Sequence, residues 1–368
     1  MLTIDGFTFL PVSFMLMRFR PARLCTEMEQ ATACHDKETQ IEGIKEKTFH
    51  LLCAGGIVPA LLISSSVWAS GYPMKPVTLI VPQAPGGAND VVARIVAQRL
   101  GAVLGQPIVV DNRPGAGGNM GIQVAAKAPH DGYTLLLTVG SSFTINPSLY
   151  RKIPFDPVKD FEPITLVATA PYLLVTNPAI QARSVQDLIG LARSKPGKLD
   201  YASAGNGTLN HLLGEMLKAK AGIEITHVPY KSAAAAATDV VAGQVPITFG
   251  SLPGVMPFVK TGQLRVLGVA TEKRSRLIPD VPTIGEAIPG YSAVSWYGLL
   301  APAGTPKEIL AQLHAEVTKV LHGKDVQDKL AAQGAEAASN TPEQFRALIK
   351  DDLVKWAKVV RDSGAQVD

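Results

Sequence analysis

The sequence predicts an α/β protein with two lobes, built from parallel-rich sheets with flanking helices and joined by a hinge that the chain crosses twice. The chain has 368 residues, of which 46% are hydrophobic and 18% are charged. This length and composition suit two globular domains with sizeable cores. Short apolar runs alternate with longer helical patterns after Gly71, in two successive series. Such strand–helix–strand repeats favour parallel sheets that are covered on both faces.

The first series begins with a continuous apolar run over residues 77–81, as expected for a buried strand. Apolar residues then recur at helical spacing from Val92 to Leu104. We expect strands over 77–81, 108–110 and 133–139, and helices over 89–104 and 121–128.

The second series starts near Ala170 and ends in a mainly helical segment. Ser184 is placed to begin its first helix, because a serine before a helical pattern is a favoured N-cap. We expect strands over 172–175, 225–228, 245–249, 264–270 and 297–301. We expect helices over 185–194, 208–220, 233–242, 306–322, 325–333 and 342–362.

The order of these elements predicts where the lobes begin and end. Candidate crossings between lobes lie at 167–172 and 292–298. Residues 70–168 and 296–368 would then form lobe 1, and residues 169–295 lobe 2. Two crossings make a natural hinge, because a few residues can absorb the rotation of one lobe on the other.

The charge and the cysteines exclude several classes of protein. The formal net charge is +4 and no run of five Lys or Arg occurs, so nucleic-acid binding is not supported. All three cysteines, Cys25, Cys34 and Cys53, lie within the first 53 residues. The chain after Gly71 therefore has no disulfide, thiol nucleophile or thiolate metal site, and it suits an oxidising compartment.

An apolar segment over residues 51–69 follows Lys45 and Lys47 and ends in Val-Trp-Ala. This pattern is typical of a secretory signal peptide cut after Ala69. The alternative is a single membrane anchor. Residues 1–44 are unusual before a signal peptide, and a start codon placed too far upstream explains them. We expect residues 1–69 to be a removed leader and the protein to be periplasmic.

A glycine-bearing loop between the first strand and its helix is the first candidate binding site. Two glycines allow the backbone to approach a ligand closely, and the free N–H groups at the start of a helix attract anions. The loop lacks the patterns of dinucleotide and P-loop sites. The alternative is a plain turn capped by Asn89 or Asp90. The candidate residues are Pro85, Gly86, Gly87, Ala88, Asn89 and Asp90.

A second loop of the same kind lies in the other half of the chain. It contributes the candidates Ser203, Asn206, Gly207 and Thr208, and a third loop contributes Ser141. Two such loops, one per lobe, would face each other across a cleft.

Three further features of the sequence give weaker indications of a binding role. Tyr230 and Lys231 are candidates because the lysine could pair with a carboxylate, although a solvated surface lysine is the usual outcome. His211, one turn into its helix, is expected to be a packed or capping residue. The glycine-rich stretch 111–118 is expected to shape its lobe.

Catalytic and metal motifs are missing from the sequence. It has no GxSxG, no HExxH and no Cys–His pairing, and His130, His211, His227 and His314 lack ligand spacing. We therefore expect a binding protein with no catalytic residues, metal or cofactor.

Several ordered motifs resemble those of the extracytoplasmic solute receptors of tripartite tricarboxylate transporters, the Bug family. They span nearly all of the chain after residue 70. The matching segments are Tyr72–Pro73, Pro76–Pro82, Ala84–Gly87 with Asp90 and Ala93–Arg94, Val110–Gly118, Ile145–Tyr150, Asp156–Phe161, Val228–Lys231 and Pro279–Thr283.

The resemblance implies a type II periplasmic-binding-protein fold that closes on a small carboxylate, such as a di- or tricarboxylate, an acidic amino acid or an aromatic acid. It also implies membrane transporter subunits as partners, and we expect a monomer. Three positions depart from the family pattern, namely Gln83 in place of an aromatic residue, Ser232 in place of glycine and Pro246 in place of an acidic residue. These departures bear on which ligand binds.

Three other functions remain open. An enzyme on the same scaffold would need a reactive group in the cleft. A regulator's effector domain would need a DNA-binding helix-turn-helix, where this chain has a hydrophobic leader. A ligand-sensing receptor for a membrane signalling system would have the same sequence features as a transport receptor.

Overall fold

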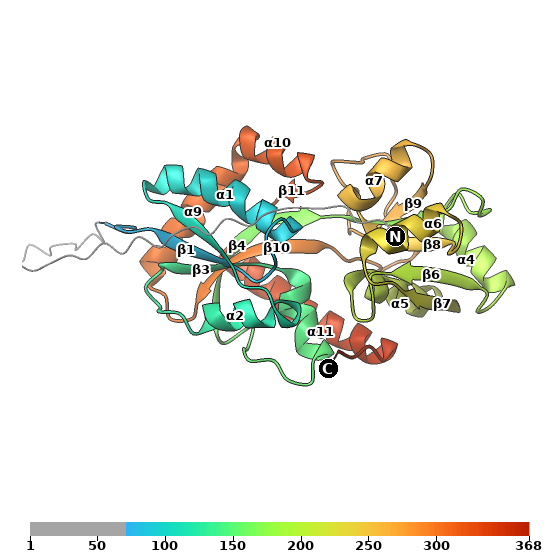
Figure 1. The fold of residues 1–368 in the computed structure, drawn as a ribbon, viewed down its shortest axis with the longest axis horizontal. Helices are drawn as coiled ribbons and strands as arrows, with labels where there is room; N and C mark the ends of the chain where they lie inside the picture. The colour runs from blue at the N-terminus through green and yellow to red at the C-terminus, as the bar shows by residue number, and fades with distance from the viewer. Residues whose placement is uncertain (1–70, 368) are drawn as a thin grey trace, which may run out of the picture. The chain divides into compact units, whose positions relative to one another are not determined.

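The computed structural model describes residues 71–367 (Figure 1). The expected leader and the three cysteines lie outside these residues. Among the described residues, none of the helices is both long and apolar enough to cross a membrane. Two sheets organise this part of the chain.

The first sheet has six strands in the order β11-β4-β10-β3-β1-β2. The three strands β1, β2 and β3 pair in parallel, whereas β10 runs antiparallel to both β3 and β4. The strands are β1 (Val77–Val81), β2 (Ile108–Asn112), β3 (Thr134–Val139), β4 (Phe161–Ala170), β10 (Ser295–Pro302) and β11 (Glu336–Ala337).

Alternate residues of these strands build a core on each face of the sheet. Leu79 packs into one cluster with α1 and α9, while the next residue, Ile80, packs into another with α2 and α11. This follows from the period of two along a strand. Figure 1 shows the two helix layers on opposite sides of the sheet. The helices are α1 (Ala88–Leu104), α2 (Asn119–Ala126), α9 (Lys307–His322), α10 (Lys324–Ala332) and α11 (Pro342–Ser363).

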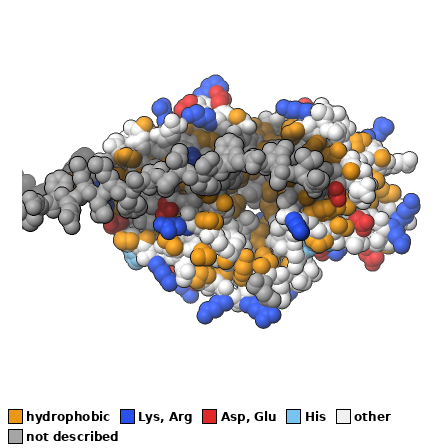
Figure 2. Space-filling view, viewed as in Figure 1, with side chains coloured by type: hydrophobic (Ala, Val, Ile, Leu, Met, Phe, Trp, Pro, Cys, Tyr) orange, Lys and Arg blue, Asp and Glu red, His pale blue; other side chains and the backbone are white. Residues whose placement is uncertain are grey.

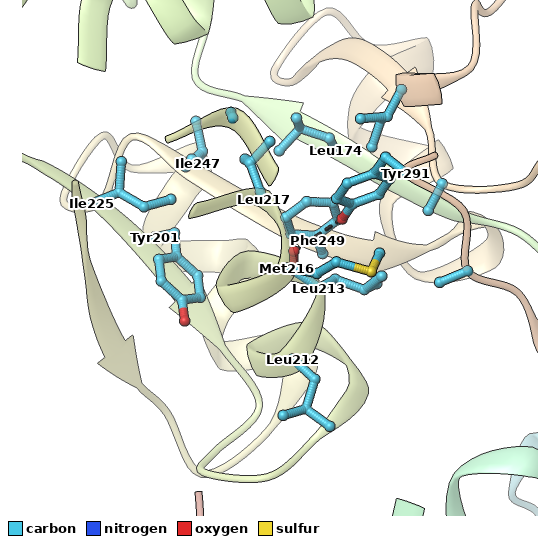
Figure 3. Packing of buried hydrophobic residues seen from close by; sticks show 14 of the residues in the cluster. Leu174, Tyr201, Leu212, Leu213, Met216, Leu217, Ile225, Ile247, Phe249 and Tyr291 are labelled. Atoms are coloured by element: carbon cyan, nitrogen blue, oxygen red, sulfur yellow. Dashed lines mark hydrogen bonds between the residues drawn. The ribbon is translucent and has the colours of Figure 1, made fainter. Parts of the chain in front are cut away.

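The second sheet has five strands in the order β7-β6-β8-β5-β9. Leu174 faces the core under α4 and α5, and its neighbours Leu173 and Val175 face α6 and α7. Figure 3 shows the first of these cores, in which the Tyr291 hydroxyl donates to Leu213 O at 2.9 Å. The strands are β5 (Tyr172–Thr176), β6 (Leu199–Ser203), β7 (Ile225–Pro229), β8 (Ile247–Ser251) and β9 (Arg265–Val269). The helices are α4 (Val185–Ser194), α5 (Leu209–Ala221), α6 (Ala233–Val241), α7 (Leu252–Lys260) and α8 (Ile284–Ala287).

The chain passes between the sheets twice. It leaves the first sheet where β4 ends at Ala170 and β5 begins at Tyr172. It returns between Ala293, whose N–H donates to Ala270 O directly after β9, and the start of β10 at Ser295. Both passages lie within residues 167–172 and 292–298, and the two sheets with flanking helices agree with the expected two-lobed α/β fold.

Helix α11 contacts both lobes. Phe345 and Ile349 near its start pack with the first sheet, whereas Trp356 and Val360 near its end join the core of the second sheet. The assignment of residues 296–368 to lobe 1 therefore describes the start of α11 but not its end, which packs against the second lobe.

The sheets combine parallel and antiparallel pairs, and several elements were not predicted from the sequence, among them β4, β6 and α7. In β4, Pro163 lies opposite Leu300, where β10 carries a register shift, and proline inside a sheet is otherwise a sign against a strand. The strand β6 is short and contains Asp200, and α7 contains Pro253 and Pro257. In each of these three segments the local sequence disfavours the observed strand or helix, and tertiary packing outweighs that preference.

Candidate functional site

The loop Pro85–Asp90, here called loop 1, connects β1 to α1. Gly86 has a φ of +79°, a conformation that glycine adopts freely. Gly87 is the N-cap of α1 and the helix has no side-chain cap. Neither Asn89 nor Asp90 therefore caps the helix, and the expected capping role of these two residues is wrong.

Asp90 holds loop 1 from inside. Its Oδ2 accepts hydrogen bonds from Gly86 N and Arg94 Nε, both at 2.9 Å, and its Oδ1 accepts from Asn112 Nδ2 at 3.0 Å. Burial alone would raise the pKa of Asp90, but the hydrogen bonds from Arg94, Gly86 and Asn112 outweigh it and lower the pKa. The Asp90 carboxylate thus shapes the loop, and its oxygens face donors of the protein itself.

A buried amide network supports loop 1 from below. Asn89 Nδ2 donates to Leu137 O at 3.1 Å and to Gln83 Oε1, and Gln83 Nε2 donates to Ser142 Oγ at 3.0 Å. Asn89 Oδ1 is buried without a partner. The predicted Ser141 begins a short π-helical turn over Ser141–Ile145, but its neighbour Ser142 makes the contact. The sequence predicted a loop at Ser141, whereas the structure has a π-helical turn there, and Ser142 rather than Ser141 bonds to Gln83 and Gly117.

The glycine-rich stretch beside the network has the structural role expected of it. Gly117 O accepts from Ser142 Oγ at 2.7 Å and from Asn146 Nδ2 at 3.1 Å. The short helix α3 (Asn146–Leu149) is therefore tied to the same network.

The loop Ser203–Thr208, here called loop 2, connects β6 to α5. Ser203 Oγ accepts from Gly205 N at 3.0 Å, and Thr208 Oγ1 donates to Gly205 O at 2.7 Å. Thr208 is the N-cap of α5, but its side chain bonds within the loop and leaves the helix without a side-chain cap. Like α1, α5 therefore begins with backbone N–H groups that no side chain covers.

Two histidines lie under loop 2. His211 Nδ1 accepts from Gly207 N at 3.1 Å, and His227 Nε2 lies 2.6 Å from Ser203 Oγ. The two rings stack with centroids 4.0 Å apart. His211 is packed and capping, as predicted, whereas His227 was not recognised because nothing in its strand sequence marks it.

The Ser203–His227 pair has the spacing of a serine with a general base, but Ser203 is fully buried. Its hydroxyl is also shared with Gly205. A nucleophile must reach its substrate, so this pair is better described as part of the loop. The described residues contain no cluster of His, Cys, Asp and Glu that could hold a metal.

Tyr230 and Lys231 come directly after β7, and Tyr230 lies next to loop 2. Tyr230 N donates to Ser203 O at 3.0 Å, and burial, followed by its hydrogen bond to Asp239, raises the pKa of the Tyr230 hydroxyl. Lys231 is exposed, as expected of a solvated lysine.

Loop 2 also touches the first lobe. A Cβ on Gly207 would lie 2.6 Å from Leu149 Cδ1, and Asn206 Nδ2 donates to Gln366 O at 3.2 Å. Leu149 belongs to α3, whose Asn146 holds Gly117. A chain of contacts thus runs from the network under loop 1 to loop 2.

A groove of about 850 Å³ lies elsewhere, between α5, residues 290–292 and α11. None of the residues of either loop lines it. Its charged lining residues are Glu215, Lys218, Lys220, Glu224, Lys355, Lys358 and Asp362. Figure 2 likewise shows lysine and arginine side chains dispersed over the face in view, with acidic ones among them.

Known proteins resemble the chain over most of its length. The sequence profile of the tripartite tricarboxylate transporter family receptor matches residues 92–365. Protein BugT of Bordetella pertussis (strain Tohama I) is 38% identical over 307 residues, which cover 83% of this chain and 94% of BugT.

Two solved structures carry bound acids. R. palustris Rpa4515 with adipate is 37% identical, with a TM-score of 0.68 over 81% of this chain and 100% of that one. MatC (Rpa3494) from Rhodopseudomonas palustris with bound malate is 31% identical, with a TM-score of 0.64 over 78% of this chain and 100% of that one. On this evidence, the chain belongs to the tripartite tricarboxylate transporter receptor family, the family of the Bug proteins.

Proposed function

We propose that this protein is an exported receptor that binds a small carboxylate between its lobes and presents it to membrane transporter subunits. The observation that carries the proposal is the pair of loops that each open a helix without a side-chain cap. The ligand is bound and released unchanged, without a covalent step.

The uncapped starts of α1 and α5 are suited to an anion. The first N–H groups of a helix have no partner inside the helix and carry a partial positive charge. Side chains cap α4, α6, α8 and α11, whereas α2, α7, α9 and α10 lack a side-chain cap as α1 and α5 do. The glycine loops that precede α1 and α5, one in each lobe, together with the uncapped starts, make these two helices the candidate pair. A carboxylate can therefore take the place of a cap at α1 and α5.

The adipate and malate held by the two R. palustris proteins support a dicarboxylate as the ligand class. Closure of the lobes about Pro171 and Val294 would bring the second loop onto a ligand bound by the first, and the closed arrangement would be the one that the transporter recognises. The proposed ligand-binding residues are Pro85, Gly86, Gly87, Ala88, Asn89, Asp90, Ser141, Ser203, Asn206, Gly207, Thr208, Tyr230 and Lys231.

A matched pair of solutes tests the ligand class. Adipate and 1,6-hexanediol have the same carbon chain and differ in their end groups. Ligand that binds only the folded protein stabilises it, by about 2.7 kcal/mol at a hundredfold excess over Kd. We expect dicarboxylates such as adipate or malate to raise the Tm of the purified protein and the diol to leave it unchanged. A rise with the diol and with none of a panel of carboxylates would refute the proposal.

A substitution tests the place of the site. A Cβ on Gly87 would lie 3.3 Å from Ala84 O, whereas one on Gly190 in α4 would meet nothing within 4 Å. Gly87→Leu should weaken carboxylate binding at least tenfold, and Gly190→Leu should leave it unchanged. Equal binding by both variants would remove loop 1 from the site.

The cellular part of the proposal has its own test. We expect the protein in the periplasmic fraction of the source bacterium, as a monomer and shortened near Ala69. Retention of the full-length chain in the membrane would favour the anchor instead.

A further inference from the structure

The hydrogen bond between Gly207 and His211 fixes the protonation state of the imidazole. The backbone N–H of Gly207 points at His211 Nδ1, so this nitrogen must present a lone pair. His211 is therefore neutral here, with its proton on Nε2. A proton added to Nδ1 would place two N–H groups against each other and break the bond.

From this geometry we propose that His211 is a positioning residue that holds loop 2 in its ligand-binding shape only while it is neutral, so that acid releases the loop and the ligand. The part that concerns the ligand rests on the function proposed above. The part that concerns the loop stands on the contacts alone.

Several charged and titratable groups surround His211. His227 of β7 stacks on it, and Glu215 Oε1 lies 3.9 Å from its Nε2. The same Glu215 oxygen already accepts from Tyr201 Oη at 2.6 Å and from Lys218 Nζ at 3.0 Å. From α11, Lys355, Lys358 and Asp362 line the groove that Glu215 and Lys218 also line.

Burial decides the balance among these groups. It lowers the pKa of His211 below the ordinary 6.5, against the attraction of Glu215 and with the help of Lys218. Burial, followed by the repulsion from His211, lowers the pKa of His227 to about 4. The folded protein thus binds fewer protons than the unfolded chain below pH 6.5, and stability is lost as the pH falls towards these lowered values.

Loss of the hydrogen bond between Gly207 and His211 would affect the whole of loop 2. Gly207 packs against Leu149 of the first lobe, and its φ of +75° is maintained by contacts on both sides. When the His211 contact is lost, the uncapped start of α5 is no longer fixed opposite a ligand. Affinity should therefore fall in acid more steeply than protonation of the ligand explains.

Two substitutions separate the acceptor from its titration. Asn Oδ1 occupies the same branch position as His Nδ1, so His211→Asn keeps an acceptor that cannot titrate near neutral pH. His211→Leu removes the acceptor. His322→Gln, at an exposed histidine at the end of α9, is the matched control.

Amide hydrogen exchange of the full chain, followed by NMR, measures the loop without any ligand. At pH 7.5 we expect the protection of the Gly207 amide to fall about tenfold in His211→Leu and to persist in His211→Asn. Between pH 7.5 and 5, protection should fall in the wild type and in His322→Gln but not in His211→Asn. Equal pH dependence in wild type and His211→Asn, or full protection in His211→Leu, would overturn the proposal.

Binding of adipate to the same variants provides the second readout. We expect a steeper loss of affinity between pH 7.5 and 5 in the wild type than in His211→Asn. If no carboxylate binds any variant at pH 7.5, the proposed function fails, while the exchange experiment still decides the role of His211.

Discussion

Loops 1 and 2 share a backbone design but are held by different chemistry. Each follows a parallel strand, contains at least one glycine at positive φ and opens a helix without a side-chain cap. Loop 1 is fixed by Asp90, a carboxylate that accepts three hydrogen bonds. Loop 2 is fixed by two imidazoles, His211, whose Nδ1 accepts from Gly207 N, and His227, whose Nε2 bonds to Ser203 Oγ.

This difference separates the two loops on the pH scale. The pKa of Asp90 is lowered from 3.8, so loop 1 keeps its anchor throughout mildly acidic conditions. The pKa values of both histidines are lowered below the ordinary 6.5, so conformations in which the rings are released bind protons first and gain in population as the pH falls below 6.5. One half of the proposed site is insensitive to mild acid and the other is not.

The largest effect is expected from substitutions of Gly207 in loop 2, compared with Gly86 in loop 1. Gly207 and Gly86 both have positive φ, but only a Cβ at Gly207 would strike Leu149. Gly86→Ala should cost about 1–2 kcal/mol of unfolding free energy for the backbone conformation alone. Gly207→Ala should cost about 2–5 kcal/mol, because overpacking adds about 1–3 kcal/mol. Urea denaturation measures the unfolding free energy of both variants. Equal losses would show that the Leu149 side chain moves aside at no cost.

A smaller effect is expected when the anchor of loop 1 is removed. Asp90→Asn keeps the shape but loses the charge that pairs with Arg94, which is itself half exposed and stays solvated. We expect a loss of about 1.5–3 kcal/mol, the range for a hydrogen bond to a charged group. The loss should be the same at pH 5 and pH 7.5, because Asp90 stays ionised in both. A loss that differs between the two pH values would contradict the contrast between the loops.

In contrast to Asp90, the two histidines should make the unfolding free energy depend on pH, by a modest amount. The unfolding free energy of the wild type should rise between pH 5 and 6.5. Each histidine contributes at most about 1.4 kcal/mol per pH unit, and His227 less because its ring is partly exposed. Replacing His227 by Gln should flatten this rise. An unchanged slope would mean that other groups cause the dependence.

The smallest effect is expected at Lys231. Its side chain is exposed, so Lys231→Met should change stability by less than about 0.5 kcal/mol. Carboxylate affinity should fall by no more than about fivefold, and salt should abolish the difference. A loss of a hundredfold would place Lys231 in direct, water-excluded contact with the ligand.

The sequence predicted most of the fold but only part of the site. Strands such as β1 and helices such as α4, with Ser184 at its cap, follow from local pattern and capping. The antiparallel return of β10 and the π-turn at Ser142 depend on contacts between distant segments. Glycines and helix starts located both loops, but they could not reveal that Asp90 points inward or that His227 of β7 contacts Ser203 on the neighbouring strand β6.

Helix α11 has a mechanical consequence for any closing motion. Phe345 is embedded in one core and Trp356 in the other, and Val367 pairs with Tyr150 beyond the end of the helix. The two lobes are thus connected by α11 as well as by the two chain crossings at Pro171 and Val294. A rotation of the lobes that keeps both sets of contacts must therefore have its axis close to α11.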